Sequence, residues 1–142
     1  MRILIVDGQG GRIGAALTEG ILRARPDADL VAVGTNTAAT QAMRKAGAAA
    51  CATGENPVLV NAARADVITG PIGVVAPDSL LGEITPRMAE AISGSAAKKI
   101  LVPVSRCNIL VAGVNTTSLS ESIEKAVELL LSIETEGQNG GK

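Results

Sequence analysis

A run of closely spaced glycines near the start of the chain has the composition of an anion-binding turn. It reads Asp7-Gly8-Gln9-Gly10-Gly11-Arg12-Ile13-Gly14 and lies between the apolar run RILIV and a segment with helical spacing of apolar residues. Glycines permit a tight turn and close approach of a ligand to the backbone, and the following helix offers unpaired amides. We expect residues 8–14 to hold a phosphate or similar anion. The alternative is a glycine-rich turn with no ligand.

Two glycines of this turn have expected roles of their own. Gly14 is expected to let the helix pack closely on the sheet. A side chain at Gly11 is expected to block the ligand and to leave the fold largely intact, because it would stand in the place of the phosphate.

The spacing of the glycines and the end of the second predicted strand bear on the type of nucleotide. The turn fits GxxGxxG rather than GxGxxG. NAD-specific folds place an acidic residue after the second strand, whereas this chain has Thr35 and Asn36. NADP, a mononucleotide or another phosphorylated metabolite therefore stay open as ligands. Thr35 and Asn36 either contact ligand hydroxyls or cap the next helix.

Further polar loops are expected at the same edge of the sheet, where the carboxyl ends of parallel strands meet. Gly70 and Pro71 are expected to line the site, and Arg106 either pairs with a phosphate or is a solvated loop arginine. Asp7 and Glu55 are the best acid or base candidates, with the bracing of a loop as the favoured alternative. Cys51 is expected to be a packing residue, and Cys107 either a buried inert thiol or a nucleophile beside Arg106.

The composition excludes several chemistries. The chain has no His, Phe, Tyr or Trp, which removes an imidazole base, a histidine zinc site, a Ser-His-Asp triad and aromatic stacking of bases. No metal is expected. A net charge of -1, from 13 basic and 14 acidic residues, argues against nucleic acid as a partner. No apolar run reaches the roughly 20 residues that span a membrane. Two separated cysteines and the lack of a signal sequence predict a cytoplasmic protein.

Strand and helix patterns alternate along the chain and position these loops. The strands expected from apolar runs are 2–6, 29–34, 48–52, 66–69, 99–104 and 109–114, and the expected helices are 12–25, 37–46, 56–64, 85–93 and one that opens at Ser118. This order predicts an α/β fold: a single Rossmann-like, doubly wound, mainly parallel sheet with helices on both faces. Residues 1–136 would form the domain and 137–142 a disordered tail, with 70–84 as a lid or subunit contact.

Two resemblances accompany these predictions. The stretches VDGQGG, VGTN, ATGEN, ADVITGPIGVV, LGEITPRMA and PVSRCN resemble a family of bacterial proteins known only as a domain of unknown function. That resemblance implies a small α/β protein and no particular activity. The GxxGRxG turn also resembles the N-terminal motif of dihydrodipicolinate reductases, which implies a pyrophosphate against Gly8, Gly11, Arg12, Ile13 and Gly14.

Three functions fit the sequence. The first is a small nucleotide- or phosphometabolite-binding protein whose glycine turn binds the anion. The second is an NADP-linked oxidoreductase, in which the cofactor supplies the hydride chemistry. The third is a non-catalytic structural or partner-binding subunit, and a homodimer would suit any of the three.

Overall fold

The computed structural model describes residues 1–104, 107–114 and 118–139. Five parallel strands form one sheet in the order β3-β2-β1-β4-β5. They are β1 (Arg2–Asp7), β2 (Asp29–Gly34), β3 (Ala50–Thr53), β4 (Val67–Pro71) and β5 (Lys98–Val102). The central strands β1 and β4 are buried along most of their length, which accounts for their continuous apolar sequences.

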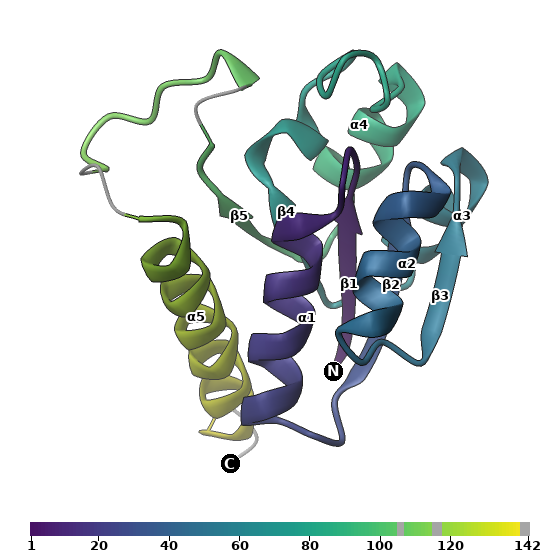
Figure 1. The fold of residues 1–142 in the computed structure, drawn as a ribbon. Coiled ribbons are helices and arrows are strands. Elements are labelled where there is room, and N and C mark those ends of the chain that lie inside the picture. The colour runs from purple at the N-terminus through teal and green to yellow at the C-terminus, as the bar shows by residue number, and fades with distance from the viewer. Residues whose placement is uncertain (105–106, 115–117, 140–142) are drawn as a thin grey trace.

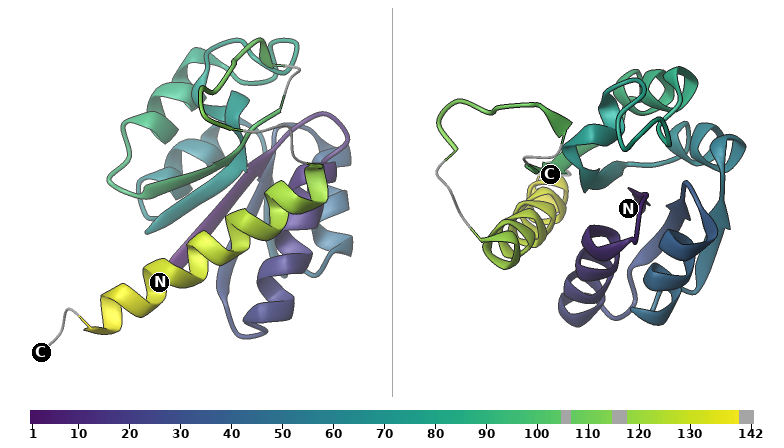
Figure 2. Two further views of the ribbon diagram at one scale, coloured as in Figure 1. Left: turned by 90° about the vertical axis from the view of Figure 1, so that its left-hand side faces the viewer. Right: turned by 45° about the horizontal axis from the view of Figure 1, so that its top comes forward.

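Helices cover both faces of the sheet (Figures 1 and 2). They are α1 (Arg12–Ala24), α2 (Thr37–Lys45), α3 (Glu55–Ala62), α4 (Pro86–Ser93) and α5 (Leu119–Asn139), with a short 3₁₀ turn at Ile72–Val75. Side chains of α1, α2 and α5 pack into one apolar cluster, and those of α3 and α4 into a second cluster on the opposite face. The predicted doubly wound α/β fold is thus confirmed.

The topology places the glycine turn at the switch point of the sheet. From β1 the chain winds outward through α1, β2, α2 and β3, then crosses through α3 to β4 on the other side of β1. Ligands of doubly wound folds bind where the winding reverses, beyond the carboxyl ends of the strands. In Figure 1 these ends point upward, toward the loops that precede α1 and α4.

Local signals in the sequence set the helix ends. Thr85 Oγ1 accepts a hydrogen bond from Met88 N at 3.2 Å, and Pro86 opens α4 as predicted. Ser118 Oγ accepts one from Glu121 N at 3.3 Å at the start of α5. Among the described residues, no helix is long and apolar enough to span a membrane.

Two predicted elements differ from the structure. Residues 109–114 form no strand: the side chain of Leu110 is 94% exposed, and Gly113 adopts a left-handed φ of 82°. Pairing with a neighbouring strand is what stabilises a strand, and none of the described strands pairs with this run, although the outer edge of β5 is open. Helix α5 continues to Asn139 and thus includes 137–139 of the predicted tail, because extending an existing helix costs little. Residues 140–142 lie outside the described residues.

Candidate anion-binding site

Asp7 ends β1 and braces the glycine turn from within. Its side chain is buried, and its carboxylate accepts hydrogen bonds from Gly8 N at 2.8 Å and Gly14 N at 2.7 Å. Burial raises the pKa of Asp7, the amide bonds to Gly14 and Gly8 lower it, and the nearby charge of Glu83 raises it further; the net shift is upward. The bracing role expected for Asp7 is confirmed, and several inner amides of the turn are satisfied by the chain itself.

Gly11 and Gly14 serve packing between elements. A Cβ on Gly14 would lie 2.6 Å from Met43 Sδ and 2.8 Å from the Cβ of Asp7, which confirms that Gly14 permits close packing of α1. Gly11 has a φ of 74°, and its Cβ would lie 2.7 Å from the Cα of Ala39 in α2. The prediction that a side chain at Gly11 would block the ligand and leave the fold largely intact is therefore wrong, because the Cβ of that side chain would point into α2.

Gly10 is the position of the turn that faces open space. A Cβ built on Gly10 has no atom within 4 Å, and the residue is exposed. Arg12 is exposed beside it at the start of α1, and Ile13 is partly buried against the cluster formed by α1, α2 and α5. A ligand could therefore reach the turn over Gly10.

Three hydrogen-bond donors from two loops converge on one oxygen of Glu83. Glu83 Oε1 accepts hydrogen bonds from Gln9 N at 3.1 Å, Thr35 Oγ1 at 2.6 Å and Asn36 Nδ2 at 2.6 Å. Its other oxygen accepts from the side-chain amide of Gln9. Burial alone would raise the pKa of Glu83, but the hydrogen bonds from Thr35, Asn36 and Gln9 outweigh it and lower the pKa. An anionic oxygen is therefore held at this point.

The loops after β1 and β2 thus meet as the sequence predicted. Asn36 Nδ2 also donates to Gln9 O at 3.0 Å, and Asn36 Oδ1 accepts from Ala39 N at 2.9 Å, which makes Asn36 the N-cap of α2. Asn36 therefore caps the helix and contributes to the donor cluster at once. Thr35 donates to Glu83 and lies close to Gly8, since a Cβ added to Gly8 would lie 2.6 Å from Thr35 Oγ1.

The remaining predicted site residues are less directly involved. Gly70 and Pro71 end β4 next to β1 and are buried, and a Cβ on Gly70 would lie 2.2 Å from Val6 O. Gly70 and Pro71 therefore form part of the sheet edge, but they are buried and expose no surface that a ligand could contact. Arg106 lies outside the described residues. Thr69 precedes them in β4, and its Oγ1 is a buried hydroxyl without a hydrogen-bond partner among the described residues.

Glu83 itself was missed by the sequence reasoning. It belongs to the irregular segment before α4 and is 48 residues from Thr35 along the chain. The available signal was a single acid within the otherwise apolar stretch LLGEI. Residues 70–84 were predicted to be a lid or a subunit contact. Val74 and Ile84 have neither role, because both are 0% exposed within the cluster formed by α3 and α4.

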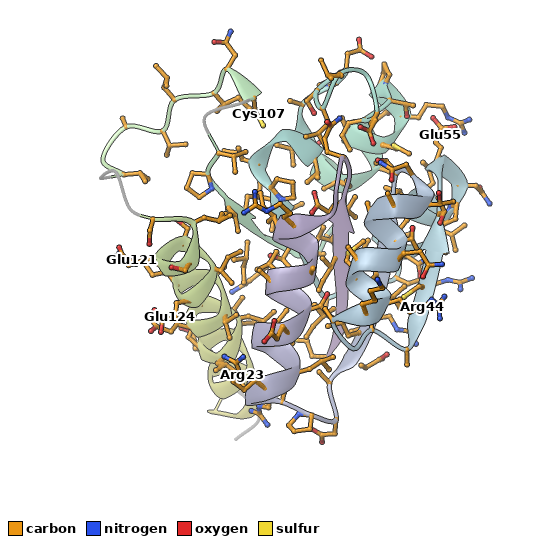
Figure 3. All side chains as sticks on the ribbon, viewed as in Figure 1. Arg23, Arg44, Glu55, Cys107, Glu121 and Glu124 are labelled. Carbon is orange, nitrogen blue, oxygen red and sulfur yellow. The ribbon has the colours of Figure 1, made fainter. Side chains whose placement is uncertain are left out.

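Glu55 braces loops at the same end of the molecule. It accepts a hydrogen bond from Thr85 Oγ1 at 2.6 Å and lies 3.6 Å from Arg87, so that α3 is tied to the start of α4. Figure 3 shows Glu55 and Cys107 toward the end that carries the carboxyl ends of the strands, with Arg23 near the other. Cys51 and Cys107 are free thiols, each partly buried, and Cys107 packs against Gly73.

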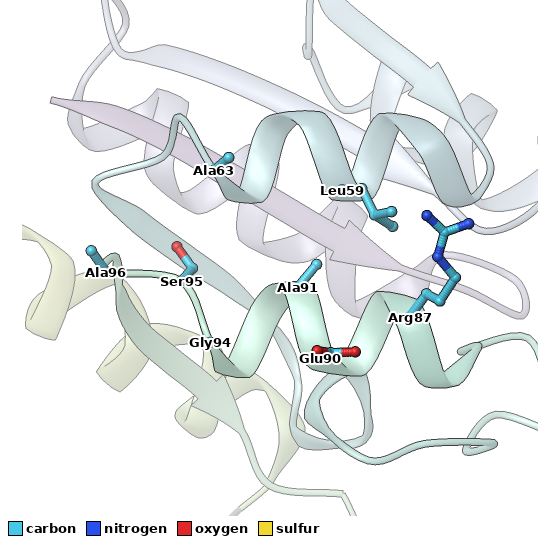
Figure 4. A pocket seen from close by; sticks show the side chains of 8 residues that line it. All are labelled: Leu59, Ala63, Arg87, Glu90, Ala91, Gly94, Ser95 and Ala96. Atoms are coloured by element: carbon cyan, nitrogen blue, oxygen red, sulfur yellow. The ribbon is translucent and has the colours of Figure 1, made fainter.

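Two grooves lie away from the glycine turn. One, of about 590 Å³, runs between α3 and α4, with Arg87 and Leu59 facing one another across it in Figure 4. The other, of about 910 Å³, lies between β5 and α5 and includes Leu101, Val114 and Leu129. Neither is lined by the donors that converge on Glu83. Among the described residues, no group of three or more Cys, Asp or Glu side chains could hold a metal ion.

Comparisons with known proteins identify a family and no activity. A model of the family described as a Domain of unknown function (DUF3842) matches residues 2–135. No curated protein matches the chain. Among solved structures, the chain is similar to a crystal structure of a dodecameric FMN-dependent Ubix-like decarboxylase from Escherichia coli O157:H7. The two are 19% identical, the match covers 89% of this chain and 74% of that chain, and the TM-score is 0.46.

Proposed function

The chain belongs to this family of unknown function, as its sequence motifs predicted, and we therefore propose its function from the geometry of the site. We propose that it binds a small phosphorylated ligand, a nucleotide or a phosphometabolite, beyond the carboxyl ends of β1 and β2. One observation carries this proposal: Gln9 N, Thr35 Oγ1 and Asn36 Nδ2 converge on a single anionic oxygen. Donors preorganised around one negative oxygen are what a phosphate site requires.

The position of the donors supports the same function. They lie at the switch point of a doubly wound sheet, and the turn that carries Gln9 leads into the N-terminus of α1. The open space over Gly10 gives a ligand access to the turn. Because the donors are a backbone amide, a hydroxyl and a side-chain amide, they would recognise the anion by geometry without adding a formal charge.

Ligand binding can be tested by thermal shift and calorimetry with inorganic phosphate, AMP, ATP, NAD, NADP and sugar phosphates. A ligand at 100 times its dissociation constant stabilises the folded state by about 2.7 kcal/mol. Gly10→Leu should abolish the response, because the side chain fills the open approach to the turn. Gly137→Leu is the matched control, since Gly137 is also open but lies in α5. A lack of response from the unaltered protein to every anion would refute the proposal.

A second candidate role is self-association, which the exposed apolar surface beside β5 favours. Val114 is 50% exposed and Leu129 57% exposed, and both line the groove between β5 and α5. Among the described strands β5 pairs only with β4, so its outer edge is unpaired. Exposed apolar patches and bare sheet edges are common features of interfaces between subunits. We propose a homodimer through this face.

Sedimentation measurements test the homodimer. The unaltered protein should sediment as a dimer, and Val114→Ser combined with Leu129→Ser should yield a monomer with unchanged far-ultraviolet circular dichroism. Val60→Ser is the matched control, because Val60 is 37% exposed on α3, away from this face. A monomeric unaltered protein over the micromolar range would rule this role out.

A further inference from the structure

Glu83 occupies the donors that an incoming anion would need. Its Oε1 already accepts three hydrogen bonds, and its Oε2 accepts one from the Gln9 side chain. Asp7 takes the amides of Gly8 and Gly14, and Gly11 N donates to Gly8 O. A phosphate at the turn can therefore obtain the converging donors only by taking the place of Glu83.

The segment that delivers Glu83 is held in an unfavourable backbone conformation. Asp78, Leu80 and Leu81 have φ values of 63°, 57° and 55°, and Gly82 follows with 87°. Residues with a Cβ adopt this left-handed region only at a cost, and such residues cluster at active sites, ligand clamps and switch regions. Leu81 is 94% exposed, so its burial offsets none of this cost, whereas Leu80 is partly buried against the apolar cluster formed by α3 and α4.

The tip is fastened to the glycine turn by few contacts. Within the segment, Asp78 N donates to Ile84 O at 2.8 Å and Ile84 N to Ser79 O at 3.2 Å, which closes its base. Ile84 anchors that base, since it is 0% exposed. Beyond the base, the described hydrogen bonds between tip and turn are those of Glu83 and one from Gln9 Nε2 to Leu80 O at 3.1 Å. Displacement of the tip would break these hydrogen bonds and the packing of Leu80 on the cluster formed by α3 and α4, while Ile84 keeps the base in the core.

We propose that Glu83 is an internal substitute for the ligand's phosphate, so that residues 80–83 must leave the glycine turn when a phosphate monoester binds. This inference rests on the proposed function and adds to it the regulation of the site and the class of ligand. A terminal phosphate brings three oxygens and a charge of about -1.5 to -2, and so exceeds the single charge of the carboxylate that it replaces. A phosphodiester brings one charge and has no such advantage.

Removing the carboxylate should therefore strengthen binding. The probes are inorganic phosphate and AMP, titrated by calorimetry against the full chain and against Glu83→Gln and Glu83→Ala. Glu124→Gln is the matched control, because it removes the same charge from an exposed position on α5. We expect dissociation constants at least tenfold lower in both Glu83 variants than in the unaltered protein and in Glu124→Gln. The methyl ester of AMP, a phosphodiester, should bind the unaltered protein at least tenfold more weakly than AMP.

The outcomes separate this inference from the proposed function. If the unaltered protein binds AMP and the Glu83 variants bind it equally or more weakly, Glu83 is a brace or a ligand contact, and the inference is overturned while the proposed function stands. Equal binding of AMP and its methyl ester overturns the ligand class. An absence of binding in every protein overturns both proposals.

A second measurement covers the case in which the Glu83 variants do not fold. Amide hydrogen exchange of residues 80–83 in the unaltered protein should become faster when inorganic phosphate is added to saturation, because the segment leaves the turn. Unchanged or slower exchange at saturation would contradict the displacement.

Discussion

Replacing Gly11 with alanine should destabilise the fold, whereas the same change at Gly10 should not. At Gly11 the φ of 74° is left-handed, and the added Cβ would lie 2.7 Å from the Cα and 2.8 Å from the carbonyl oxygen of Ala39. The backbone of α2 cannot yield as the end of a flexible side chain can. At Gly10 the Cβ meets no atom within 4 Å.

The magnitude follows from two costs. Left-handed backbone costs a residue with a Cβ roughly 1–2 kcal/mol, and overpacking typically costs about 1–3 kcal/mol. Gly11→Ala should therefore lower the free energy of unfolding by roughly 2–5 kcal/mol. That is a large share of the about 5–15 kcal/mol that stabilises an ordinary domain. Gly10→Ala should leave it unchanged or raise it by up to about 1 kcal/mol, because alanine restricts the unfolded chain.

Urea denaturation followed by circular dichroism at 222 nm measures both variants. Each kcal/mol corresponds to a shift in Tm of roughly 2–8 °C, so Gly11→Ala should also melt about 5 °C or more below the unaltered protein. The reasoning is refuted if Gly11→Ala stays within about 0.5 kcal/mol of the unaltered protein, the range of an ordinary surface substitution. It is equally refuted if Gly10→Ala is the more damaging change.

The remaining predictions concern the two carboxylates at the turn and the start of α4. The pKa of Asp7 is raised above its usual 3.8, so its ionisation should cost stability as the pH rises from about that value through the raised pKa. Glu83→Gln should move the pKa of Asp7 downward in a carbon NMR titration, since it removes a neighbouring negative charge; an unchanged midpoint would contradict the coupling. The pKa of Glu83 is lowered from its usual 4.5, so its ionised carboxylate stabilises the fold above that pH, and this stability is lost as the pH falls through the lowered pKa. In Glu83→Gln this acid-induced loss of stability should be absent. Thr85→Ala should cost about 0.5–2 kcal/mol or more in urea denaturation, because it removes the N-cap of α4 together with the hydrogen bond to Glu55. A loss no greater than that of the exposed control Thr37→Ala would argue against it.

The sequence predicted well what depends on local pattern. The continuous apolar run of β1, the glycine turn and the caps at Thr85 and Ser118 are short-range features, and the structure has them where they were expected. Parallel strands bring their carboxyl ends to one edge, so the meeting of Thr35 and Asn36 with the glycine turn also followed from the order of the elements.

What the sequence could not predict depends on contacts across long separations. Glu83 reaches the turn only because Asp78, Leu80 and Leu81 adopt left-handed backbone, a conformation that residues with a Cβ seldom take. The direction of Gly11 toward Ala39 depends on how α1 and α2 pack, and glycine spacing carries no information on that. Residues 109–114 have the apolar composition of a strand, yet a strand also has to pair with a neighbouring strand, and composition does not reveal whether this run does so.

A protein whose two apolar clusters contain only aliphatic side chains and methionine is almost transparent in the near ultraviolet. The full chain has no Trp, Tyr or Phe, so it lacks the side chains that absorb near 260–280 nm and fluoresce. Any strong band in that region from the purified protein must therefore come from something bound to it. A nucleotide retained through purification would be detected in a single absorbance spectrum. Its release by excess inorganic phosphate could be followed by the same absorbance, without a label.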